Sequence, residues 1–174
     1  MASKPLHTKL REKRNRPPGP FVWFTREMLE SYAMAAMSPP ALRIILRVCI
    51  EHIAHAGSEN GNLDITYDAF VKYGVRRSAI RSGIATAVAL GFLIVTREGK
   101  PSAGNNRWPT CFALGWLPMY DGVAARNGWK RFESLQHARD TVSSAIAALR
   151  PRRPSRPSPS LPTARVIPLY RQDI

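Results

Sequence analysis

The sequence is poor in the residues that build most metal and redox sites. It has two cysteines and four histidines in 174 residues. Cys49 and Cys111 have no CxxC partner, so neither a zinc knuckle nor a redox pair is indicated. His52 and His55 are spaced i, i+3 beside Glu51, which is not a metalloprotease motif, and no third ligand is evident. We therefore expect no bound metal.

Acidic residues are also scarce, at 12 Asp+Glu. Several stand at the expected starts of helices, and they form no convincing carboxylate pair or metal triad for nuclease chemistry. The glycine-rich segments do not match a phosphate-binding loop. We therefore expect that the protein is not an enzyme and uses no cofactor.

Long hydrophobic runs are missing as well. The longest stretch without charge or strong polarity, Gly83 to Val95, has 13 residues, whereas a membrane-spanning helix needs about 20. The basic N-terminus lacks the apolar core of a signal peptide. Both cysteines have apolar neighbours, so we interpret them as buried free thiols, although one disulfide is arithmetically possible. These features predict a cytoplasmic protein without membrane contact.

What the sequence has in excess is positive charge. It contains 26 Lys+Arg, for a formal net charge of +14. Residues 1–20 and 150–174 each carry a net +5, and the region between them carries +4. Such an excess favours polyanionic partners, nucleic acid first and anionic membranes second. The hydrophobic fraction of 44% is enough for a folded core.

Both ends of the chain have compositions that cannot bury an apolar face. Five basic residues between Lys9 and Arg16 precede Pro17-Pro18-Gly19-Pro20, and five prolines occur in residues 150–163. We expect residues 1–20 to be a basic flexible arm and residues 150–174 a Pro/Arg-rich flexible tail. The arms either contact DNA or only add solubility. The apolar stretch within residues 165–174 is a candidate docking peptide for a protein partner.

The region between the arms has the periodicity of helices and short strands. The expected elements are a helix capped by Thr25 with Met28, Leu29, Tyr32, Ala33 and Ala36 on one side; a central helix from Ser38 to about Ala56; an extended piece at 63–65; a brief helix from Tyr67 to about Tyr73; a helix from about Arg76 to Leu90; strands at 92–96 and 110–116 around a polar loop; and a helix from about Lys130 to Leu149. The predicted inner faces are Leu42, Ile45, Leu46, Cys49 and Ile53 on the central helix, broadened by Ile44, Val48 and Ile50, and Ile80, Ile84, Ala87 and Val88 on the helix from Arg76.

Two segments in this region carry a family resemblance. The run TYDAFVKYGVRRSAI, Thr66 to Ile80, resembles the helix-turn-helix of bacterial winged-helix proteins. The run ALGFLIVTR, Ala89 to Arg97, is similar to the junction between recognition helix and wing in that family. The resemblance covers roughly residues 39–117, and the overall layout resembles small winged-helix proteins of proteobacterial plasmids, phages and integrative elements.

The resemblance implies a mostly α fold with a small β-hairpin wing. The winged helix-turn-helix domain would occupy residues 21–120, with an added helix before its core and a C-terminal helix in 121–149. The family binds duplex DNA with its recognition helix, here about residues 76–90, in the major groove. Its wing, here residues 97–110, contacts the backbone or minor groove.

Charge and side-chain size on the expected recognition helix select candidate DNA contacts. Ser78, Arg81, Ser82, Ala85 and Thr86 fall away from the apolar stripe, and their short members would let the helix enter the groove. The candidates are Arg77, Ser78, Arg81 and Ser82 for base edges, Lys72 and Arg76 for phosphates, and Arg97, Lys100, Asn105, Asn106 and Arg107 on the wing. The alternative for each is a solvated surface residue.

These observations lead to one functional hypothesis and two alternatives. The leading hypothesis is a sequence-specific double-stranded DNA-binding protein that regulates transcription on a mobile element. The alternatives are a replication initiator or accessory protein that binds origin repeats, and an architectural or RNA-binding protein without sequence preference. The helix at 130–149 offers either a homodimer interface or a surface that packs on the Met28/Tyr32 face of the same chain.

Overall fold

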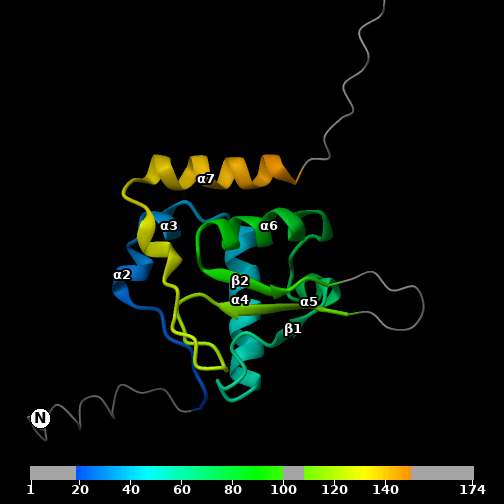
Figure 1. Ribbon diagram of the computed structural model, residues 1–174. Helices are drawn as coiled ribbons and strands as arrows, with labels where there is room; N and C mark the ends of the chain where they lie inside the picture. The colour runs from blue at the N-terminus through cyan, green and yellow to red at the C-terminus, as the bar shows by residue number, and fades with distance from the viewer. Residues whose placement is uncertain (1–18, 100–107, 150–174) are drawn as a thin grey trace, which may run out of the picture.

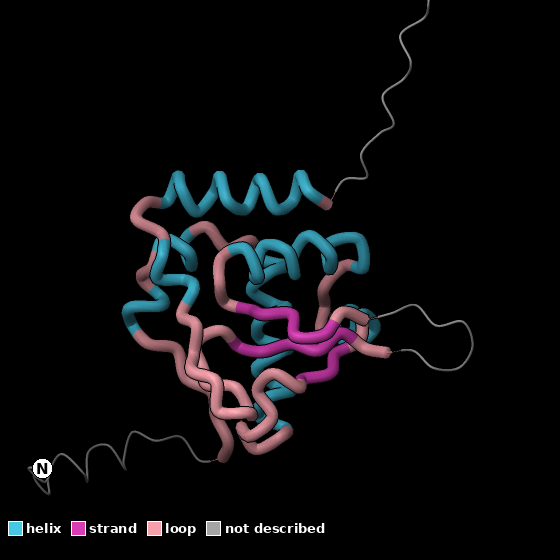
Figure 2. The backbone as a smooth tube through the Cα atoms, in the orientation of Figure 1, coloured by secondary structure: helices cyan, strands magenta, loops and turns pink. Residues whose placement is uncertain are grey.

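The computed structural model describes residues 19–99 and 108–149. The predictions of flexible ends, of a docking peptide at 165–174, and of wing contacts by Lys100, Asn105, Asn106 and Arg107 lie outside these residues. About half of the described residues are helical, and three short strands form an antiparallel sheet (Figures 1 and 2). The elements are α2 (Arg26–Leu29), α3 (Tyr32–Ala35), α4 (Pro39–Ala54), β1 (Leu63–Ile65), α5 (Tyr67–Lys72), α6 (Arg77–Ala89), β2 (Leu93–Arg97), β3 (Thr110–Leu114), the 3₁₀ helix η1 (Gly128–Arg131) and α7 (Leu135–Ala148).

Strand β3 is the centre of the sheet, and its order is β1-β3-β2. Leu63 of β1 pairs with Phe112, and Leu93 of β2 pairs with Leu114. Strands β2 and β3 are therefore antiparallel neighbours joined by residues 98–109, as expected for a hairpin. The register shifts between Val95 and Arg97, which marks a bulge where the hairpin leaves the core.

Helix α4 is central, as the sequence predicts, because it packs on α6, β1 and β3. Its buried face matches the predicted one in part: Ile44, Ile45, Val48 and Cys49 are buried as predicted, and Ala41 and His52 are buried beside them. Leu42 and Ile50, which were predicted to face inward, are exposed. The contact with α6 is close because Gly83 has no side chain. A Cβ on Gly83 would lie 2.6 Å from Cδ1 of Ile44.

The predicted single helix after Thr25 is wrong. Thr25 caps α2 as expected, with its hydroxyl accepting a hydrogen bond from the Met28 amide at 3.2 Å. The Ser31 hydroxyl then accepts from the Met34 amide at 3.1 Å and begins a second helix, α3. A serine that can cap a helix competes with continuation of the preceding one, and only Met28 and Ala33 of the predicted face are fully buried.

The predicted start of the last helix at Lys130 is also wrong. Residues Gly128–Arg131 form η1, the chain extends at Phe132, and Ser134 caps α7. This break lets Trp129 and Phe132 enter the core, where 4% and 6% of their surfaces remain exposed. Burial of these large aromatic rings stabilises the break more than an extra helical turn would.

Helix α7 lies alongside α6 and runs in the opposite direction, with α3 at its N-terminal end (Figures 1 and 2). Ala138 is buried, and the other residues of the predicted seam are partly buried: Leu135, Val142, Ala145 and Leu149. The seam thus packs on its own chain, but against α6 and α3 and not on the predicted Met28/Tyr32 face alone. Within residues 19–99 and 108–149, no helix combines the length and the apolar character needed to cross a bilayer.

Candidate nucleic-acid interface

Helices α5 and α6 are joined by a sharp turn that the sequence encodes locally. The Thr66 hydroxyl accepts from the Ala69 amide at 3.2 Å and caps α5. Gly74 ends it in a left-handed conformation, with φ of 87°. The guanidinium of Arg43 donates to the Gly74 carbonyl at 2.9 Å, which ties the turn to α4. The angle between the two helices is therefore fixed by capping and by one contact to the central helix.

The open face of α6 is its N-terminal half. Arg77, Ser78 and Arg81 are exposed, as the sequence predicts. Ser82 is half-buried, and its hydroxyl donates to the Ala79 carbonyl at 3.2 Å. Short side chains therefore stand beside two arginines on a helix surface that a groove could accommodate.

Two predictions for the C-terminal half of α6 are wrong. Thr86, expected on the open face, is 1% exposed, and its hydroxyl donates to the Ser82 carbonyl at 2.9 Å. Val88, expected to face inward, is 37% exposed. The buried face of α6 is wider than a single apolar stripe because the helix contacts α4, β2 and α7 on different sides. Gly83 and Thr86 are short enough to fit beneath these neighbours.

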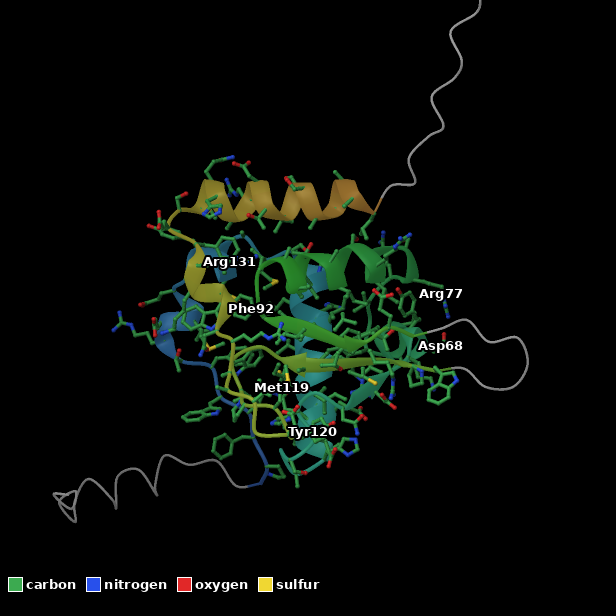
Figure 3. All side chains as sticks on the ribbon, in the orientation of Figure 1. Asp68, Arg77, Phe92, Met119, Tyr120 and Arg131 are labelled. Atoms are coloured by element: carbon green, nitrogen blue, oxygen red, sulfur yellow. The ribbon has the colours of Figure 1, made fainter. Side chains whose placement is uncertain are left out.

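The basic side chains at this end differ in their partners. Arg77 forms an ion pair with Asp68 of α5, and both side chains are more than half exposed (Figure 3). Lys72, Arg76 and Arg81 are exposed and form no ion pair within the part of the chain that the structure describes. Three cations are thus available to phosphates, while the fourth is held by a carboxylate.

At the root of the hairpin, Arg97 joins three elements. It donates to Asp64 of β1 at 3.0 Å, and its guanidinium carbon lies 5.7 Å from the ring centroid of Trp108. The Cys111 thiol also donates to Asp64. Burial, together with this carboxylate, raises the pKa of Cys111 to about 11. Asp64, an exposed residue of the edge strand β1, therefore positions Arg97 across the surface of the sheet.

These groups lie at one end of the molecule. Figure 1 shows α5, the start of α6, the end of β2 and the start of β3 together on the right, and Figure 3 places Asp68 and Arg77 there. Sequence reasoning missed Asp64, Asp68 and Trp108. The sequence did offer two signals: an acidic residue in each neighbouring element, and a tryptophan beside a basic loop. It could not show which residues these side chains contact, because those contacts are tertiary.

The remaining titratable groups do not extend this site. Burial raises the pKa of the Cys49 thiol to about 12, and burial with the charge of His55 lowers the pKa of His52. Both cysteines are free and buried, as predicted. Among the described residues, no cluster of three or more histidine, cysteine or acidic side chains could hold a metal ion.

Comparisons with protein-family models, with curated proteins and with solved structures gave no match for this chain. The interface is therefore defined by its own geometry and charge. Its centre is the open face of α6, and its edges are the end of α5 and the root of the hairpin.

Proposed function

We propose that this chain is a winged-helix protein that binds duplex DNA in a sequence-specific manner and regulates transcription. The element order α4-β1-α5-α6-β2-β3, with sheet order β1-β3-β2, supports the winged-helix assignment. A helix-turn-helix followed directly by a hairpin places a groove-sized helix and a wing on one side of a compact core. The proposal is that α6 enters the major groove and the hairpin lies on the adjacent backbone or minor groove.

One observation carries this proposal: the exposed group Arg77, Ser78 and Arg81 on the first turns of α6. Arginine can bind both acceptors on the major-groove edge of guanine, and a serine allows the backbone to approach the bases. Helix α6 contacts α4, α5, β2 and α7, so these exposed side chains stand on a helix that is supported by the rest of the fold.

The surrounding cations provide the sequence-independent part of binding. Lys72 ends α5 and Arg76 is the N-cap residue of α6, and their exposure supports a role for both in binding phosphates beside the groove. Arg97 marks the root of the wing, where it is held by Asp64. A net charge of +14 adds long-range attraction for a polyanion.

Selection of bound duplexes from a random library tests the proposal. We expect a preferred sequence to emerge, and genomic mapping to find it at one or two positions upstream of genes. Clustered direct repeats beside an AT-rich tract would instead indicate a replication initiator. Binding that shows no preferred sequence and is abolished by salt would indicate an architectural protein.

Arg81→Ala then tests the role of α6. We expect it to weaken the preferred site by about 5- to 150-fold, corresponding to one bidentate base contact, and to weaken random DNA much less. Arg26→Ala is the matched control, because it removes the same charge from α2, where Arg26 pairs with Glu30. Equal losses by Arg81→Ala on both DNAs would contradict base reading by α6.

The basic arm is tested separately in the full-length background. Deletion of residues 1–16 removes six basic side chains and one acidic side chain. We expect preferred and random DNA to bind more weakly by the same factor. The slope of log affinity against log salt should fall by roughly one unit for each phosphate that the arm neutralises. An unchanged slope would show that the arm does not contact DNA.

A further inference from the structure

Two of the four tryptophans stay largely in solvent: Trp23 is 66% exposed and Trp108 is 56% exposed, whereas Trp116 and Trp129 are 8% and 4% exposed. Of the two, Trp108 is the one that lies beside the basic side chains described above. A large aromatic side chain gains little stability when most of its surface stays in water. Trp108 lies just before β3, at the root of the hairpin, where nothing in the core requires an indole.

The Trp108 ring contacts Arg97, which is in turn paired with Asp64. The Arg97 guanidinium lies over the Trp108 ring, and Asp64 accepts a hydrogen bond from that guanidinium at 3.0 Å. Asp64 is itself contacted by the Cys111 thiol within the sheet. An arginine fixed by a carboxylate is oriented before any ligand arrives, so the indole that it supports has reduced freedom to turn away.

The positive charge near Trp108 indicates which kind of planar ligand its indole would contact. Trp108 lies two residues before β3, and the start of β3 is at the same end of the molecule as α5 and the basic start of α6 (Figure 1). An aromatic ring beside cations is the arrangement that single-stranded nucleic-acid sites use, because every base has a flat face and every nucleotide has a phosphate.

We propose that Trp108 is a stacking site for a nucleobase. This inference rests on the proposed DNA-binding function and deepens it, because it adds a contact to an unstacked base beside the contacts to an intact groove. The base can come from two sources, an unpaired nucleotide in the DNA or a base-pair step that opens when the duplex is kinked. Trp108 supplies the flat surface, and Arg97 supports it from the opposite side.

Affinity measurements with three DNA probes test the stacking site: an intact duplex of about two helical turns, the same duplex with one unpaired nucleotide, and the single strand. The variants are Trp108→Ala, Trp108→Phe and Trp23→Ala. Trp23 is 66% exposed, precedes α2 and lies outside the hairpin, so it is the matched control. We expect Trp108→Ala to bind DNA that offers an open base on the order of tenfold more weakly. Trp108→Phe should retain most of the affinity, and Trp23→Ala should match the wild type.

The pattern across probes identifies the source of the base. A loss confined to the unpaired and single-stranded probes indicates unpaired nucleotides, and an equal loss on the intact duplex indicates an opened step. Stacking should also quench tryptophan emission on binding, and the quench should disappear in Trp108→Phe but persist in Trp23→Ala. If the wild type binds DNA and the Trp108 variants show the same affinity and the same quench, the stacking inference is overturned and the proposed function is not. Absence of DNA binding by the wild type at low salt would instead remove the proposed function.

Discussion

Asp68 on α5 and Arg77 at the first position of α6 form an ion pair across the turn between these two helices (Figure 3). Both side chains remain more than half exposed, so the pair adds little to stability. Its consequence is positional. The carboxylate limits the orientations of the guanidinium on the surface that we propose to face DNA.

Asp68→Asn should therefore separate affinity from discrimination. Removal of a negative charge beside the phosphates raises affinity for random DNA. At the same time Arg77 loses its orientation, and the ratio of affinities for preferred and random DNA should fall by at least about threefold, part of the roughly 1–3 kcal/mol that a bidentate arginine contributes. Competition binding at fixed salt measures both quantities. Glu30→Gln on α2 is the control, because it also releases an arginine from an ion pair, and an unchanged ratio for Asp68→Asn would show that the pair has no positioning role.

Gly91→Ala should destabilise the fold far more than Gly122→Ala. Both glycines have positive φ, 77° and 86°, so alanine at either costs about 1–2 kcal/mol. Nothing lies within 4 Å of a Cβ on Gly122, whereas a Cβ on Gly91 would lie 2.4 Å from the carbonyl carbon of Gly128. Backbone cannot move aside cheaply, which adds about 1–3 kcal/mol. Urea unfolding of both variants gives the difference, and equal losses would show that η1 does not pack tightly on Gly91.

Stability should decrease as the pH falls from 7 towards 5, in part because of His52. Burial, with the nearby His55, lowers its pKa in the folded state, so the unfolded chain binds a proton at a pH where the folded protein does not. The contribution of His52 to the free energy of unfolding is complete above the ordinary histidine pKa and is lost as the pH falls below it. The free energy of unfolding then falls by at most about 1.4 kcal/mol per pH unit because of this residue. His52→Gln should flatten the curve of unfolding free energy against pH. His55→Gln removes a histidine whose side chain is 46% exposed and should flatten it less; the reverse order would contradict burial as the cause.

The two thiols should be inert in the native protein. The pKa values of Cys49 and Cys111 are raised to about 12 and 11, and 3% and 2% of their surfaces are exposed. Thiolate is the reactive form, so a disulfide reagent at mildly alkaline pH should label neither residue until the protein unfolds, and then both. Labelling followed through a urea titration measures this. Rapid reaction of one thiol without denaturant would show that its surroundings open locally.

Much of the helical framework could be predicted because its signals are local. Thr25, Thr66 and Gly74 cap or end helices through hydrogen bonds and dihedral angles that involve only nearby residues. The strand predicted at 92–96 from its β-branched and aromatic content is β2 at 93–97, and the segments expected to be extended at 63–65 and 110–116 contain β1 and β3. The exposure of Arg77, Ser78 and Arg81 followed from helical periodicity on a single helix.

The buried faces were predicted less well, because a face depends on what packs against it. Leu42 and Ile50 belong to the apolar side of α4 by composition, yet they are exposed because the sheet and α6 lie on the other side. Thr86 is polar, yet it is buried because its hydroxyl is satisfied within its own helix.

Local chemistry in the chain was sufficient to specify where most helices begin and end and where the positive charge accumulates, since capping, periodicity and charge act over a few residues. Long-range packing was needed to bring Asp68 to Arg77, to hold Arg97 between Asp64 and Trp108, and to place α7 along α6. Those contacts join residues from different elements, and their partners are selected by the shape and burial of the whole core, which no short stretch of sequence contains.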